Sequence, residues 1–114
     1  MTAETTPTRT ETDSLGSIGI PADRYWGPQT ERARRLFRIG TERFPPALIR
    51  ALGLHKWACA EANERLGELP PEIAGPIRRA AQEIADGLRD ADFPLPVWQT
   101  GSGTQTNMNA NEVI

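Results

Sequence analysis

Residues 45–88 read PPALIRALGLHKWACAEANERLGELPPEIAGPIRRAAQEIADGL, and their spacing predicts two helices. The first is expected from Pro45 to Leu66, because the N–H that proline lacks has no intrahelical partner in a first turn. Apolar side chains at steps of three or four predict its buried face: Leu48, Leu52, His55, Cys59, Ala62 and Leu66. Gly67 is expected to close this helix. Gly53 is expected to weaken its middle by about 1 kcal/mol relative to alanine.

The second helix is expected from Pro71 to Leu88. Its predicted buried face consists of Ile73, Ile77, Ala81, Ile84 and Leu88. Residues 67–70 form a connection short enough for an antiparallel helical hairpin. Residues 93–98 must be extended, because alternating prolines forbid a helix. The predicted fold class is therefore mainly α.

The segment before this hairpin is expected to contribute little to the core. Residues 1–14 are rich in threonine and lack an apolar pattern, which predicts a disordered tail. A short strand is expected at Ile18–Ile20, ended by Pro21. The adjacent Tyr25 and Trp26 are expected to pin a loop, with a turn at 27–28. One or two helical turns are expected over 30–37.

The amino-acid composition limits which kinds of binding partner and compartment are expected. The 114 residues carry a net charge of -2 with both signs interspersed, so no basic surface for nucleic acid is expected. No run of 18 apolar residues exists, so no membrane span is expected. Cys59 is the only cysteine, which excludes an internal disulfide or a cysteine-based metal site and favours a cytoplasmic protein. His55 and Cys59 are interpreted as packing residues.

Residues 99–112 read QTGSGTQTNMNANE, a stretch of hydroxyls, amides and glycines with almost no charge. A helix is expected from about Gln105, with Ser102 or Thr104 as its N-cap. A loop that leads into a helix N-terminus can bind an anion, because free N–H groups and the helix dipole both favour negative charge. An ordinary flexible loop is the alternative. The spacing fits neither a P-loop nor a dinucleotide fingerprint.

The stretch from Trp98 to Ile114, WQTGSGTQTNMNANEVI, resembles a hallmark segment of class II fumarate hydratases in the fumarase/aspartase superfamily. Residues 20–30, IPADRYWGPQT, are similar to that family's N-terminal motif. The resemblance covers about residues 14–114 but only the N-terminal part of the family's length. Aspartate ammonia-lyases share the Asn-Met-Asn-x-Asn-Glu run. They typically carry Gly-Ala-Gly-Thr-Ser where residues 101–105 read Gly-Ser-Gly-Thr-Gln, a difference that favours fumarase.

The resemblance implies reversible hydration of fumarate to (S)-malate in the tricarboxylic acid cycle, without metal or cofactor, by a homotetramer built on a long central helical bundle. Ser102, Gly103 and Thr104 match the Ser-Gly-Thr that binds a substrate carboxylate in the family. The family's catalytic histidine, its Gly-Ser-Ser loop with the catalytic serine, and its lysine and asparagine pocket residues match nothing here. No catalytic residue is therefore expected in this chain, which is expected to be inactive alone.

These observations divide the chain into three expected parts: a disordered tail over 1–14, an N-terminal helical domain with the substrate-binding loop over 15–103, and a central-bundle helix beginning at 104. That helix is expected to be cut at Ile114, because it has run less than three turns and no residue closes it. Two alternatives remain. The parent protein could be an aspartate ammonia-lyase, or the chain could be a non-catalytic binding or scaffold module.

Overall fold

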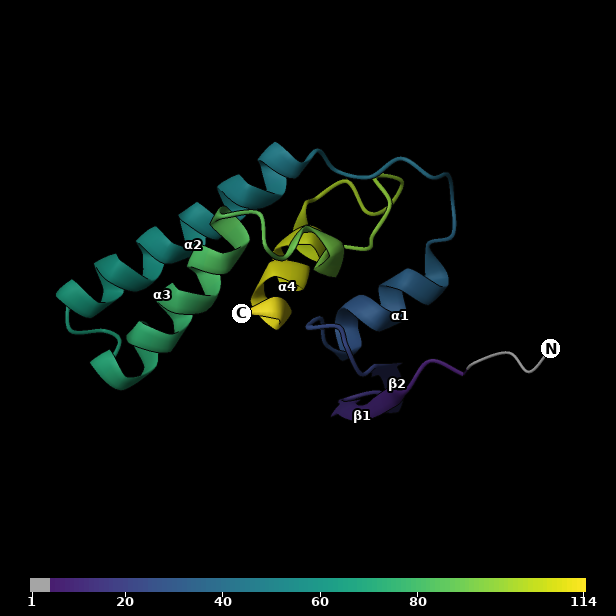
Figure 1. Cartoon of the computed structure of the whole chain (residues 1–114), viewed down its shortest axis with the longest axis horizontal. Helices are drawn as coiled ribbons and strands as arrows, with labels where there is room; N and C mark the ends of the chain where they lie inside the picture. Colours follow the sequence, from purple (N-terminus) through teal and green to yellow (C-terminus); the bar gives the residue numbers. More distant parts are fainter. Residues whose placement is uncertain (1–4) are drawn as a thin grey trace.

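The computed structural model describes residues 5–114, so the first four residues of the expected tail lie outside it. The described elements are β1 (Thr8–Asp13), β2 (Gly16–Pro21), α1 (Pro28–Leu36), α2 (Pro46–Arg65), α3 (Pro71–Ala85), the 3-10 turn η1 (Asp90–Asp92) and α4 (Thr104–Val113). Helices α2 and α3 form a long arm, α1 and the β-hairpin lie at the other end, and α4 lies between them (Figure 1). The prediction of a mainly α fold is confirmed.

The antiparallel hairpin of α2 and α3 follows the prediction closely. Helix α2 differs from the expected bounds by one residue at each end, and α3 ends three residues earlier than expected, at Ala85. Gly67 follows α2 with φ +75°, the left-handed conformation expected of a closing glycine. The two helices run side by side along the arm (Figure 1).

The buried face predicted for α2 is wrong. Leu48 is 43% exposed and Leu66 is 74% exposed, whereas the buried positions are Ile49, Gly53 and Ala60. Because α2 carries apolar side chains around most of its circumference, its periodicity fits two stripes one residue apart. Helix α3 packs against the stripe that contains the smaller residues.

The buried face of α3 is only partly as predicted. Ala81 and Ile84 are fully buried, as expected, and Ile77 is half-buried. Ile73 and Leu88 are exposed, and Ala74 is buried in their place.

Gly53 lies at the contact between α2 and α3. A Cβ atom built on Gly53 would lie 2.6 Å from the Ala85 amide nitrogen and 2.8 Å from the Ile84 Cβ. Backbone and buried side chain cannot yield at that distance without separating the two helices. The absence of a side chain at this position therefore permits the helix contact, in addition to lowering helix propensity.

The prediction of a disordered tail is wrong for Thr8–Asp13, which form β1 and pair antiparallel with β2. Threonine at every second position suits a strand, because β-branched side chains favour extended backbone. Arg9 adds a tertiary contact that sequence reasoning missed: its guanidinium donates hydrogen bonds to the backbone carbonyls of Pro21, Arg24 and Trp26. The expected strand at Ile18–Ile20 is present within the longer β2.

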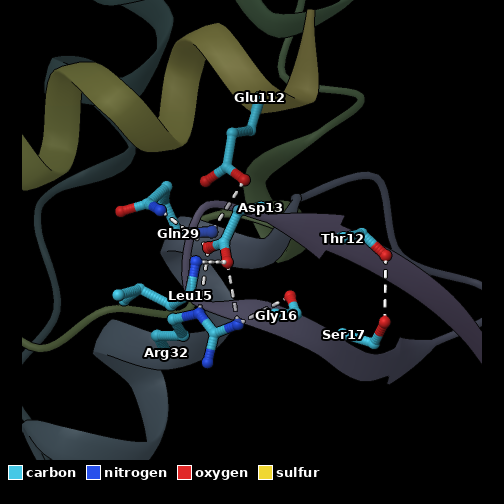
Figure 2. Close-up of polar contacts among 8 residues, drawn as sticks. All are labelled: Thr12, Asp13, Leu15, Gly16, Ser17, Gln29, Arg32 and Glu112. Carbon is cyan, nitrogen blue, oxygen red and sulfur yellow. Dashed lines mark hydrogen bonds and ion pairs between the residues drawn. The ribbon is translucent and has the colours of Figure 1, made fainter.

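The turn of the β-hairpin is joined to α1 by a charged cluster (Figure 2). The Asp13 carboxylate accepts hydrogen bonds at 2.8 and 2.9 Å from the fork of Arg32, and one at 2.7 Å from the Gln29 side chain. The backbone N–H of Leu15 donates to the same carboxylate at 2.9 Å. The Arg32 hydrogen bond is the main reason why the pKa of Asp13 is lowered from its ordinary value.

Asp13→Asn is expected to lower the melting temperature at pH 7, because the neutral amide cannot accept the paired donors of Arg32. A carboxyl whose pKa is lower in the folded state stabilises the fold above its unfolded pKa of about 3.9 and loses that contribution as pH falls through the folded value. Thermal melts between pH 7 and pH 2 should therefore show the two proteins converging at the acid end. The control is Asp23→Asn at an exposed position. A constant difference across the pH range would contradict the prediction.

The hydrophobic core lies where the β-hairpin, both arm helices and α4 meet. Its buried members are Ile18, Ile20, Trp26, Ile49, Ile84, Phe93, Ala110 and Val113. Trp26 confirms the expected pinning aromatic, whereas Tyr25 is 52% exposed. The expected turn at 27–28 is instead the start of α1, with Gly27 as N-cap and Pro28 in the first turn. Within residues 5–114, no helix is both long and apolar enough to cross a membrane.

Candidate functional site

The loop before α4 places the three predicted binding residues together. Helix α4 begins at Thr104, and its N-cap is Gly103, with φ +81° and ψ -3°. The expectation of Ser102 or Thr104 as N-cap is therefore wrong. The left-handed backbone at this position favours glycine, which leaves the hydroxyl of Thr104 outside any capping bond.

Ser102 and Thr104 present adjacent hydroxyls at the mouth of the helix. Their side-chain oxygens lie 3.0 Å apart, and the Thr104 N–H donates to Ser102 Oγ at 3.4 Å. Both residues and Gly103 are exposed. The first helical bond runs from Asn107 N–H to Gly103 O at 3.0 Å, so the Gln105 and Thr106 N–H groups have no acceptor within the helix. This end of α4 thus offers hydroxyls and free amide donors that suit a carboxylate or phosphate.

Polar contacts hold α4 and the loop before it in place. Buried Asn109 donates its side-chain amide to the Asp92 carbonyl at 2.9 Å. Gln99 donates to the Pro96 carbonyl at 2.9 Å, which fixes the start of the loop. Lys56 of α2 reaches the Asn107 side chain at 2.6 Å. The loop itself is exposed, but its flanks are anchored to packed elements.

Glu112 at the far end of α4 caps the N-terminus of α1. Its carboxylate accepts hydrogen bonds from the Thr30 hydroxyl at 2.6 Å, the Thr30 N–H at 2.7 Å and the Gln29 N–H at 3.0 Å. Helix α1 needs this contact because its own N-cap, Gly27, has no side chain to offer. Figure 2 shows Glu112 reaching down to α1 from above the Asp13 cluster. The partners lie 82 residues apart, so no local sequence pattern could reveal this cap.

A second buried carboxylate organises α1. Glu31 is fully buried and accepts from Trp26 Nε1 at 2.8 Å, while Arg34 and Arg35 pair with it at 2.9 and 3.0 Å. Burial by itself raises the pKa of Glu31, but hydrogen bonds from Arg34, Trp26 and Arg35 outweigh it and leave the pKa lowered. The lowered pKa favours the ionised form of Glu31, whose carboxylate joins Trp26, Arg34 and Arg35.

His55 and Cys59 lie one helical turn apart on α2, with His55 Nε2 3.7 Å from Cys59 Sγ. His55 is exposed, and Cys59 is half-buried. Neither forms a hydrogen bond with Ser102 or Thr104 among the contacts of residues 5–114. In this same range, no three or more His, Cys, Asp or Glu side chains gather where they could hold a metal ion.

Known proteins are similar to this chain over nearly all of its length. The profile of a family described as lyase matches residues 16–114. The chain belongs to this lyase family. Fumarate hydratase class II 2 of Bradyrhizobium diazoefficiens is 63% identical over 107 residues, and fumarate hydratase class II 1 of Pseudomonas aeruginosa is 61% identical over 106 residues. These alignments cover 94% and 93% of this chain.

The structural comparison agrees. A crystal structure of class II fumarase from Schistosoma mansoni superposes with a TM-score of 0.90 at 40% identity, over 94% of this chain and 23% of that protein. The predicted resemblance to the N-terminal region of class II fumarate hydratases is confirmed. The chain spans 23% of the length of the two bacterial relatives.

Proposed function

We propose that this chain is the N-terminal part of a fumarate hydratase, which adds water reversibly to fumarate to give (S)-malate in the tricarboxylic acid cycle. The observation that carries the proposal is the exposed Ser102-Gly103-Thr104 turn at the N-terminus of α4. We assign this turn to one carboxylate of the substrate. The similarity to relatives named fumarate hydratase supports the hydratase over an aspartate ammonia-lyase.

The chemistry needs the donors that this turn supplies. Proton removal next to a carboxylate places extra negative charge on that carboxylate in the transition state. The hydroxyls of Ser102 and Thr104 and the amide donors of α4 would stabilise this charge. A positioned base must take the proton, and among residues 5–114 no titratable side chain forms a hydrogen bond with Ser102 or Thr104. We therefore assign no catalytic residue to this chain and expect it to be inactive alone.

The whole enzyme is proposed to be a homotetramer that needs no cofactor, with its substrate pocket completed by further segments. A cytoplasmic location is proposed because Cys59 is the single cysteine of the chain. Proteins of oxidising compartments commonly carry disulfides, which need two cysteines. The alternative of a non-catalytic module rests on the same absence of a base. An assay of the full-length protein decides between them.

Thr104→Ala in the full-length enzyme is expected to lower kcat/KM by roughly tenfold. A hydrogen bond to a charged group is worth roughly 1.5–3 kcal/mol, and an exposed hydroxyl belongs at the lower end of that range. The melting temperature should stay nearly unchanged, because Thr104 is not the N-cap of α4. Loss of fumarate absorbance gives the rate, and ammonia release from aspartate tests the competing lyase reaction.

Thr41→Ala is the matched control, because Thr41 is also an exposed threonine in a loop. The 114-residue chain alone should leave fumarate absorbance constant in the same assay. A normal kcat/KM in Thr104→Ala would remove the substrate role of this turn. Turnover by the short chain would show that its own residues suffice for catalysis.

A further inference from the structure

Four arginines surround a cavity of about 290 Å³ at the C-terminal end of α1. The lining residues are Arg34, Arg35, Phe37, Arg38, Gly40, Arg43, Pro94 and Pro96. Neither the Ser102–Thr104 turn nor the Asp13 cluster contributes to it. It is a separate feature of the fold, named here the arginine pocket.

Tertiary structure assembles the arginine pocket from two distant segments. Arg43 and Pro96 form an isolated antiparallel bridge, and Val97 N–H donates to the Glu42 carbonyl at 3.0 Å. These contacts lay the segment after α1 against the proline-rich segment that leads to α4. Arg38 and Arg43 are thereby brought to one cavity with the two arginines of the last turn of α1.

Positive charge in this pocket exceeds negative charge. Arg34 and Arg35 share one carboxylate, the buried Glu31, and Arg35 also donates to the Gly19 carbonyl at 2.7 Å. Among residues 5–114, neither Arg38 nor Arg43 pairs with a carboxylate; the contact of Arg43 is with the Glu42 carbonyl at 3.5 Å.

The nearby Glu42 carboxylate forms its hydrogen bonds with other groups. It accepts from Trp98 Nε1 at 3.0 Å and from the Thr41 N–H at 3.1 Å. Arg38 and Arg43 thus form no ion pair within hydrogen-bonding distance in the described chain, although the Glu42 carboxylate still interacts electrostatically with Arg43.

We propose that the arginine pocket binds a compact multivalent anion, with the guanidinium groups of Arg38 and Arg43 as its direct donors. Guanidinium groups match phosphate and carboxylate oxygens in paired hydrogen bonds, so a phosphate or a small polycarboxylate fits their geometry. The volume of about 290 Å³ is at the lower limit of ligand pockets, which favours a small anion. Arg34 and Arg35 add positive potential, although each is partly neutralised by Glu31.

A bound anion would link Arg38 and Arg43 within the segment after α1, next to Pro94 and Pro96 of the second segment. The second segment leads directly to the loop before α4. The proposal does not depend on the hydratase function. The competing explanation is that these arginines only offset the negative end of the α1 dipole, in which case no ligand binds.

Calorimetric titration of the 114-residue chain with inorganic phosphate and, separately, with citrate tests the proposal at constant ionic strength, with chloride as the reference anion. Saturable binding of at least one of the two is expected. The double variant Arg38→Gln/Arg43→Gln should weaken it about tenfold or more, because two charge-assisted contacts are lost. Tighter binding of phosphate would identify a phosphoryl ligand, and tighter binding of citrate would identify a polycarboxylate.

Two controls separate this site from others. Arg65→Gln removes an exposed arginine at the end of α2 and should leave the affinity unchanged. Thr104→Ala should also leave it unchanged, so that binding at the loop before α4 is not mistaken for binding here. Circular dichroism confirms that the double variant is folded. No saturable binding, or equal binding by the wild type and the folded double variant, would overturn the proposal.

Discussion

Glu112→Ala is expected to lower the free energy of unfolding by about 2–4 kcal/mol. The substitution leaves three donors of the first turn of α1 without their acceptor: the two N–H groups form the helix cap, worth about 0.5–2 kcal/mol, and the buried hydroxyl costs about 1–3 kcal/mol when unpaired. Those donors are the N–H groups of Gln29 and Thr30 and the Thr30 hydroxyl. Thr30 is fully buried, so water cannot easily replace the lost carboxylate.

Urea unfolding of the chain measures this effect, and Glu68→Ala is the control at an exposed glutamate after α2. Thr30→Val removes only the hydroxyl donor and should cost less than Glu112→Ala. The double variant should lose less unfolding free energy than the sum of the two single variants, because both substitutions remove the same hydrogen bond. Full additivity, or an unfolding free energy equal to that of the wild type, would show that Glu112 does not stabilise α1.

Gly53→Ala is expected to lower the free energy of unfolding by about 1–3 kcal/mol, the usual cost of overpacking a core. Helix propensity alone predicts the opposite sign, a gain of about 1 kcal/mol. Packing dominates here because the new methyl would lie 2.6 Å from the backbone nitrogen of Ala85. The helices α2 and α3 would have to separate, which loosens the arm shown in Figure 1.

Gly75→Ala in α3 is the matched control. A Cβ atom at Gly75 would meet only the Arg79 guanidinium, at an ordinary distance of 3.5 Å. Alanine should therefore stabilise α3 by about 0.5–1 kcal/mol there. Opposite signs for the two substitutions in urea unfolding would confirm the packing role of Gly53. Equal stabilisation by both would mean that α2 and α3 have room between them.

Local sequence patterns predicted most of the helical framework. The paired prolines at 45–46 and 70–71, the apolar spacing and Gly67 placed α2 and α3 within a few residues of their observed bounds. They also gave the connection between these helices and the start of α4 near Thr104. These features depend on neighbours within one or two helical turns, and sequence spacing reports such neighbours directly.

The first strand of the β-hairpin was not predicted, because its residues are polar and show no alternation of apolar and polar side chains. Alternating threonines over Thr8–Asp13 suit a strand, but no apolar face accompanies them. Their pairing with β2 is reinforced by Arg9, which hydrogen-bonds to carbonyls up to 17 residues away. For the candidate site, the resemblance named Ser102, Gly103 and Thr104, but it gave no reason to expect Gly103 as the N-cap.

Sequence by itself determined the helical hairpin of α2 and α3 and the approximate start of α4, and it predicted a carboxylate-binding role for the loop before α4, which stays a prediction. Tertiary structure alone decided which stripe of α2 is buried, because a helix that is apolar on several sides accepts more than one partner face. It also decided that Glu112 caps α1 and that Arg38 and Arg43 share a cavity. Such pairings join residues far apart in sequence, and their geometry is fixed only when the core brings the segments together.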